Sequence, residues 1–220
     1  MKVETAERRE TLTRQRVLEA AVDFADREGV ESLSMRRLAS DLGVEAMSLY
    51  THIRSKHDLL DGMIEVVVAE IPIPADGAGW KASMREMVLS ARAVVLRHRW
   101  APRIIETRTA PGPAMMGYLD TVMRLLRRDG FSIDLTHHAL HLLGSRMLGF
   151  TQDLFDDSPD LGPEEAAAMA EALGPSFPHV AEMALAVTHD GGLGGCDDDL
   201  EFELGLDLIL DGLERLRDAG

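Results

Sequence analysis

Residues 33–53 read LSMRRLASDLGVEAMSLYTHI and contain two short helical patterns separated by a glycine. Ser34 stands before the first pattern, where a serine hydroxyl can accept a hydrogen bond from an unpaired backbone N–H group of the helix. Gly43 ends this first helix after barely two turns, and a second short helix is expected over about 45–52. Two short helices joined by a turn of three or four residues that contains a glycine have the layout of a helix-turn-helix motif.

The two expected helices each have an apolar and a polar face. The apolar side chains can pack the pair against a preceding helix between Thr13 and Gly29; they are Leu38, Ala39, Leu42, Val44 and Leu49. The outer face of the second helix consists of Ala46, Met47, Ser48, Tyr50, Thr51 and His52. Its polar groups can reach base edges or phosphates, and its apolar side chains can contact a thymine methyl group. This face is a candidate DNA-binding surface. One alternative is an ordinary amphipathic helix pair in an all-α protein. A separate alternative for Tyr50 alone is packing in the core.

The charge of the chain restricts where nucleic acid can bind. The 220 residues include 38 acidic and 23 basic side chains, for a net charge of −15, and residues 150–220 alone hold 18 acidic against 2 basic side chains. Residues 32–57, in contrast, carry a net charge of +2 through Arg36, Arg37, Arg54 and Lys56. A basic surface must therefore be local and lie near the start of the chain.

Apolar residues recur at helical spacing along the whole chain, and the alternating pattern of strands is almost absent. We expect an all-α fold, with an N-terminal three-helix helix-turn-helix DNA-binding domain over 1–71 and a larger α-helical ligand-binding and dimerisation domain over 72–220. The proline- and glycine-containing segment 71–79 is the expected linker. Ser55 and Asp58 begin a helix, and further helices are expected over about 80–99, 102–109, 113–128, 132–155, 163–173, 178–189 and 199–218.

The sequence favours a cytoplasmic protein without a membrane partner. Its single cysteine, Cys196, cannot form an internal disulfide, and its charged first residues do not resemble a secretory leader. No apolar stretch approaches the roughly 18 residues of a membrane span. Cys196 also lies among aspartates, which blunt the reactivity of a thiol. We expect no catalytic residue and no cofactor, and the glycine-rich segment 191–195 is expected to be a loop.

A set of residues in one register stands between Leu12 and Met63: Leu38-Ala39, Leu42-Gly43-Val44, Ser48-Leu49-Tyr50, His52, Lys56 and Leu59-Leu60-Asp61. With these residues the whole stretch resembles the TetR family of bacterial repressors. The resemblance implies that DNA is contacted by Arg36, Ser48, Tyr50, Thr51, His52 and Lys56. Lys56 suits a phosphate contact on independent grounds, because a helix N-terminus already favours an anion. Ala46 and Met47 depart from the Gln-Pro pair of the tetracycline repressor, so the operator sequence need not be the same.

The second domain resembles the tetracycline-repressor branch of the family, through Trp80, residues 96–99, Thr107-Arg108, and residues 130–132, 148–150, 202–206 and 212–214. This resemblance implies a homodimer in which helices 132–155 and 199–218 form a two-fold four-helix bundle. The apolar face of the last helix then supplies the dimer interface: Phe202, Leu206, Ile209, Leu210 and Leu213. A symmetric dimer matches a pseudo-palindromic operator with recognition helices about 34 Å apart.

The resemblance does not extend to the polar drug contacts of that branch. Its magnesium-binding histidine aligns approximately with Ile105, and its drug-contacting Asn and Gln align near Met87 and Val122. Those polar contacts are absent here, and the region carries several methionines instead, whose flexible thioethers suit varied apolar ligands. The expected pocket residues are Met84, Met87, Ala91, Ile105, Met115, Met116, Leu119, Val122, Met123, His138, His141 and Leu142. Each methionine can equally be a core residue.

Three histidines, His137, His138 and His141, have the i, i+3 and i, i+4 spacing of metal ligands on one helix, although no HExxH motif or cysteine cluster accompanies them. Three hypotheses follow. The first is a repressor that a small apolar or amphipathic effector releases from its operator DNA. The second is an all-α metal-binding protein or enzyme that uses these histidines. The third keeps the DNA-binding domain on a scaffold without a ligand.

Overall fold

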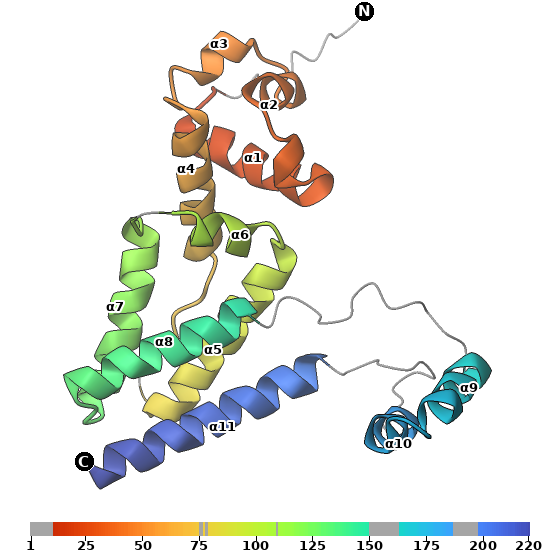
Figure 1. Ribbon diagram of the computed structural model, residues 1–220. Coiled ribbons are helices and arrows are strands. Elements are labelled where there is room, and N and C mark those ends of the chain that lie inside the picture. The colour runs from red at the N-terminus through yellow and green to blue at the C-terminus, as the bar shows by residue number, and fades with distance from the viewer. Residues whose placement is uncertain (1–10, 75–76, 78, 109, 150–162, 187–197) are drawn as a thin grey trace, which may run out of the picture. The chain divides into compact units, whose positions relative to one another are not determined.

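The computed structural model describes residues 11–74, 77, 79–108, 110–149, 163–186 and 198–220. All regular secondary structure in these residues is helical, which confirms the expected fold class (Figure 1). The chain divides into two compact units, Met1–Thr136 and His137–Gly220. The first of these contains the predicted DNA-binding domain together with three further helices.

The first unit begins with α1 (Arg14–Glu28), η1 (Val30–Ser32), α2 (Met35–Asp41), α3 (Ala46–Leu49) and α4 (Lys56–Ala69), which we call the head. The side-chain oxygens of Thr13, Ser34 and Ser55 each accept a hydrogen bond from the backbone N–H group three residues later. These contacts confirm the predicted starts of three helices, because each satisfies a backbone donor that has no partner within the helix.

Helix α3 is shorter than the predicted 45–52. The carbonyl of Glu45 accepts a hydrogen bond from the N–H of Ser48, and the carbonyl of Leu49 accepts one from the N–H of His52. Contacts between residues three apart tighten the backbone beyond α-helical geometry. Residues 50–52 therefore form turns instead of a further helical turn.

The apolar faces of the head helices meet in one core. Its buried members include Val17, Leu18, Ala21, Phe24, Leu38, Leu49, Ile53, Leu59 and Met63. Helices α1 and α4 approach each other closely at Gly62, where an added Cβ would lie 2.5 Å from a methyl carbon of Leu18. Burial of this apolar surface is the main favourable contribution to folding of the head.

Three more helices lie entirely within the first unit: α5 (Trp80–Arg97), α6 (Ala101–Glu106) and α7 (Pro113–Arg128). Helix α4 packs against α1 and also against α5, α6 and α7. The head and these helices therefore form one compact unit, and the domain boundary expected at 71/72 stays a prediction. Helix α6 ends earlier than expected, and the Thr107 hydroxyl donates to the carbonyl of Ile104 in its last turn.

Helix α8 (Ile133–Gly149) runs into the second unit, which also contains α9 (Pro163–Leu173), α10 (Pro178–Ala186) and α11 (Asp198–Ala219). Helices α9 and α10 pack against each other. The predicted helical residues 150–155 and 187–189, the loop 191–195 and Cys196 lie outside the described residues. Within the described residues, none of the helices combines the length and apolar character needed to cross a bilayer.

Candidate nucleic-acid interface

A short turn connects α3 to α2 and fixes its orientation. Gly43 has a φ of 65°, a left-handed conformation that glycine adopts without steric cost. The N–H of Val44 donates to the carbonyl of Ala39 at 2.9 Å, and the side chain of Leu49 is fully buried in the head core. The turn and this buried leucine together determine which face of α3 points outward.

The outward face of α3 and the following turn carries side chains that the sequence assigned to DNA. Met47 is 72% exposed, Tyr50 is 47% exposed, and Thr51 is also at the surface. The position of Tyr50 shows that the alternative, a tyrosine packed in the core, is wrong. Ala46, Ser48 and His52 are half-buried, and Ala46 packs against the head core. Met47 and Tyr50 are therefore the most accessible large side chains of this face.

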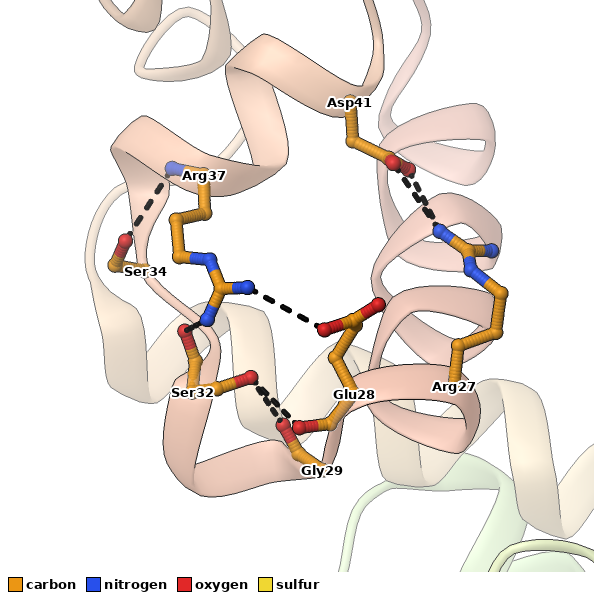
Figure 2. A network of polar contacts seen from close by, with 7 residues as sticks. All are labelled: Arg27, Glu28, Gly29, Ser32, Ser34, Arg37 and Asp41. Carbon is orange, nitrogen blue, oxygen red and sulfur yellow. Dashed lines mark hydrogen bonds and ion pairs between the residues drawn. The ribbon is translucent and has the colours of Figure 1, made fainter.

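The two arginines near the start of α2 have different environments. The guanidinium of Arg37 donates to the carbonyl of Ser32 at 3.2 Å and lies 3.5 Å from the carboxylate of Glu28 (Figure 2). It also stacks over the ring of Phe24, with Cζ 5.0 Å from the ring centroid. Arg36 is exposed, and its side chain makes no hydrogen bond or ion pair with the described part of the chain. Arg37 thus fastens α2 to α1, whereas Arg36 is available to an external anion.

The network around Arg37 extends along the end of α1. The hydroxyl of Ser32 donates to the carbonyls of Glu28 and Gly29, both at 2.9 Å. One guanidinium nitrogen of Arg27 lies 3.1 Å from both carboxylate oxygens of Asp41, at the other end of α2 (Figure 2). These contacts hold both ends of α2 against α1, so that α2 presents Arg36 in a defined place.

The N-terminus of α4 carries further candidate contact residues. Lys56 is the first residue of this helix, its side chain is exposed, and it has no ion pair among the described residues. The unpaired N–H groups of a helix N-terminus and the helix dipole both favour an anion at this position. His57 is exposed beside it. The geometry suits contact with a phosphate.

An ion pair between Arg14 and Asp58 holds this N-terminus in place. The guanidinium of Arg14 approaches the Asp58 carboxylate to 2.6 Å and also donates to the carbonyl of His52 at 2.8 Å. The same carboxylate accepts the backbone N–H of Arg54 at 2.7 Å. The hydrogen bond from Arg14 is the main reason why the pKa of Asp58 is lowered, and it raises the pKa of Arg14 in turn. The start of α1 is thereby joined to the segment between α3 and α4.

Two models of known protein families match the chain. Residues 17–63 match the model described as bacterial regulatory proteins, tetR family. Residues 73–217, more than half of the chain, match the one described as tetracyclin repressor-like, C-terminal domain. The chain belongs to the TetR family.

Individual TetR relatives match to different extents. The HTH-type transcriptional repressor DrrR1 of Streptomyces coeruleorubidus is 41% identical over 124 residues, which cover 56% of this chain but only 46%, about half, of that protein. The tetracycline repressor protein class C of Escherichia coli is 29% identical over 94% of this chain and 92% of its own length. The crystal structure of the TetR family protein ActR of Streptomyces coelicolor in complex with actinorhodin has a TM-score of 0.73 and 31% identity, covering 94% of this chain and 99% of ActR.

The expected pocket residues of the TetR C-terminal region have mixed environments in the first unit. Met84, Met87 and Ala91 of α5 and Val122 of α7 are buried, and α5 packs against α7. Ile105, Met115, Leu119 and Met123 are half-buried, whereas Met116 is 53% exposed. The structure thus brings the buried methionines of α5 close to α7, as expected for either a core or an effector site, and their role in effector binding stays a prediction.

The remaining expected pocket residues, His138, His141 and Leu142, are exposed on α8 in the second unit. The ring of His137 contacts both other imidazoles, with centroid distances of 5.8 Å to His138 and 4.6 Å to His141. Over the described residues, no three His, Cys, Asp or Glu side chains are placed to hold one metal ion. The family match favours a regulator over the alternative of a metal-binding enzyme.

The expected dimer residues of α11 are mostly covered within a single chain. Phe202, Leu206, Leu210 and Leu213 are buried, and Ile209 is half-buried. A side chain that its own chain already covers has little surface left for a second copy. The exposed apolar side chains of the same helix are Leu200, Leu204, Leu208 and Leu216. These leucines are the accessible apolar side chains of the helix, and the part that either set plays in a dimer stays a prediction.

The sequence interpretation missed three carboxylates that join α4 to the helices after it. Asp61 pairs with Arg108 at 2.8 Å, Glu65 accepts the N–H of Ala114 at the start of α7 at 2.6 Å, and Glu70 pairs with Arg97 at 2.5 Å. The only signal in the sequence is the presence of the three acidic residues at positions 61, 65 and 70. It does not identify the partners, which are 27 to 49 residues away.

Proposed function

We propose that the chain is a cytoplasmic, homodimeric regulator that binds a pseudo-palindromic DNA operator and is released from it by a small apolar or amphipathic effector. The observation that carries this proposal is the exposure of Arg36 on α2, of Met47 and Tyr50 on α3 and its following turn, and of Lys56 at the start of α4. The positive charges of Arg36 and Lys56 lie in a chain with a net charge of −15. Such local charge favours one DNA-facing surface over non-specific adhesion of the whole molecule.

The proposed DNA contacts are of two chemical kinds, to phosphates and to bases. Arg36 and Lys56 suit phosphate oxygens, which set the register of the protein on the duplex without reading its sequence. Met47 and Tyr50 suit base edges and thymine methyl groups in the major groove. Ser48, Thr51 and His52 complete the interface at its sides, where Thr51 already donates its hydroxyl to the carbonyl of Ser48 at 2.7 Å. Ala46 faces the head core and acts mainly by placing Met47.

Release requires that effector binding change the orientation of the head. Helix α4 is the element that can transmit this change, because it packs against α1 on one side and against α5, α6 and α7 on the other. The proposed effector site is lined by the buried and half-buried methionines of α5 and α7. A related protein of the same fold, ActR, was crystallised with actinorhodin. A hundredfold loss of operator occupancy needs an effector preference of about 2.7 kcal/mol for the non-binding state, an ordinary coupling energy.

The first experiment is a selection of bound fragments from a pool of genomic DNA with the purified protein, followed by titration of the best fragment at several salt concentrations. The proposal predicts a pseudo-palindrome with half-sites about one helical turn, about 34 Å, apart, and an affinity that falls steeply with salt. Enrichment no better than for random DNA would contradict it. Thermal stabilisation by apolar compounds, tested in parallel, separates a regulator with an effector from one without.

A further inference from the structure

The corner between α5 and α6 carries a buried histidine that contacts two other helices. His98 is the C-cap of α5 and is only 5% exposed. Its Nδ1 lies 2.9 Å from both carboxylate oxygens of Asp26 in α1. Its Nε2 lies 3.3 Å from Oε2 of Glu70, the C-cap of α4. One imidazole ring thus connects α1, α4 and α5, and we call this arrangement the His98 bridge.

The two carboxylates determine which form of the ring completes the bridge. A neutral imidazole has one N–H donor and one acceptor nitrogen, whereas an ionised carboxylate can only accept. A neutral ring can therefore serve one of the two carboxylates and turns a lone pair toward the other. The imidazolium donates from both nitrogens, and such charge-assisted hydrogen bonds are stronger than neutral ones. Only the doubly protonated ring satisfies both neighbours.

The other polar groups around the bridge keep the two carboxylates in place. The indole N–H of Trp100, the N-cap of α6, donates to Asp26 at 2.7 Å. The guanidinium of Arg97 shares Oε2 of Glu70 with His98. Burial by itself raises the pKa of Glu70, but the hydrogen bonds from His98 and Arg97 outweigh it and leave that pKa below its ordinary value. Glu70 thus presents an ionised oxygen to the ring at neutral pH.

We propose that His98 is a positioning residue for operator binding, which as an imidazolium between Asp26 and Glu70 holds α1 and α4 in one orientation against the α5–α6 corner. This inference rests on the proposed function and adds a proton as a second input. Because α1 supports α2 and α3, an intact bridge keeps the candidate interface in one orientation. Loss of one proton removes the hydrogen bond from His98 to one of the two carboxylates, the head samples more orientations, and the apparent affinity falls with the fraction that fits the operator.

The test compares the wild type with His98→Gln on a duplex enriched in the DNA selection. Between about pH 5.5 and pH 8, the range in which histidines titrate, the wild type is expected to lose about tenfold more affinity than the variant. His52 and His57 of the candidate interface are present in both proteins, so the difference between the two profiles isolates His98. Trp100→Phe is the matched control, because it removes the other donor to Asp26 without removing a titratable group. It should lower affinity or stability by a constant amount across the pH range.

Thermal unfolding without DNA tests the bridge separately from the DNA-binding proposal. The midpoint of the wild type should fall more between pH 5.5 and pH 8 than that of His98→Gln, because a native state that needs the proton loses stability as the proton is removed. If His98→Gln does not fold, Glu70→Gln at the more exposed end of the bridge should flatten the same profile.

Parallel pH profiles of the wild type and these variants, in unfolding and in DNA binding, would overturn the inference. So would a Trp100→Phe profile that flattens as well. A flattened unfolding profile in a protein that enriches no DNA would retain the bridge and reject the DNA-binding function.

Discussion

At the scale of single residues, the two neighbouring arginines of α2 are expected to have different roles, one in DNA contact and the other in the stability of the head. Arg37 is held by Ser32, Glu28 and the ring of Phe24, so its charge is already used within the protein. Arg36 projects from the same turn without a partner among the described residues. Two adjacent residues of one type therefore lead to opposite expectations for mutation.

Arg36→Ala should weaken binding to all DNA sequences by about five- to tenfold and reduce the salt slope by about one, because one phosphate contact is lost. Its melting temperature should stay that of the wild type. Arg37→Ala is the matched variant and should lower the free energy of unfolding by about 0.5–1 kcal/mol, since its ion pair and ring contact are both near the surface. Fluorescence anisotropy with labelled duplex and thermal unfolding measure the two effects. An exchange of phenotypes between the variants would contradict the assignment of this face.

Lys56 and Tyr50 are expected to differ in the kind of DNA contact that they make. Lys56→Ala should weaken binding about equally on the selected and on scrambled DNA and give a shallower salt dependence. Tyr50→Ala should weaken binding to the selected sequence by about 1–3 kcal/mol while leaving scrambled DNA almost unaffected, because we propose that its phenol contacts base edges. Competition titrations with both duplexes measure the ratio. Unchanged affinity in both variants would show that this surface does not face DNA.

At the scale of secondary-structure elements, local signals were predictable and long-range ones were not. Thr13, Ser34 and Ser55 act on backbone groups three residues away, so the sequence pattern identified them as caps. The contact between His98 and Asp26 spans 72 positions, and no periodicity indicates it. The length of α3 was overestimated because apolar spacing does not distinguish a helix from successive tight turns. The sequence located the positive charge in residues 32–57. It did not indicate that Arg37 has partners within the head whereas Arg36 has none among the described residues.

Helix α11 illustrates a second limit of sequence patterns. Leucines stand at positions 200, 204, 206, 208, 210, 213 and 216, so that apolar side chains surround much of the helix. A pattern that is apolar on more than one face does not indicate which face the chain itself covers. The structure resolves this, since Leu206, Leu210 and Leu213 are buried while Leu204 and Leu208 are exposed.

The ion pair between Arg14 and Asp58 connects two elements of the head and gives a prediction for acid stability. The lowered pKa of Asp58 means that its contribution is complete above the pKa of the unfolded chain and is lost as the pH falls through the lower folded value. Asp58→Asn should therefore reduce stability at pH 7 by less than about 1 kcal/mol, because the pair is partly exposed, and should become equal to the wild type in strong acid. Urea titrations across pH 2–7 measure the difference. Asp23→Asn, at an exposed position of α1, is the control for the loss of a carboxylate from the surface of the head. A constant difference at every pH would contradict the role of the carboxylate charge.

At the scale of the whole molecule, charge and symmetry act together in the proposed function. The acidic residues concentrate in the last third of the chain, while residues 32–57 within the head carry a local net charge of +2. Because the acidic last third of the chain repels DNA, association through the head is electrostatically favoured. A dimer has two such heads, fixed relative to each other. Once one head has bound its half-site, the other is held at a high effective concentration near the second half-site.

The dimer interface gives the last prediction. A double variant Leu204→Glu, Leu208→Glu places charges on the exposed stripe of α11 and should convert the dimer to a monomer, because burying unpaired carboxylates against a second copy is unfavourable. Affinity for the full pseudo-palindrome should fall by about a hundredfold or more, while affinity for an isolated half-site stays the same, because only the bivalent contribution is lost. Sedimentation velocity measures the mass, and anisotropy with full and half-site duplexes measures binding. Met169→Glu in α9 is the control, since that side chain is also exposed but lies on another helix. A double variant that remains dimeric, or a control that dissociates as readily, would place the interface elsewhere.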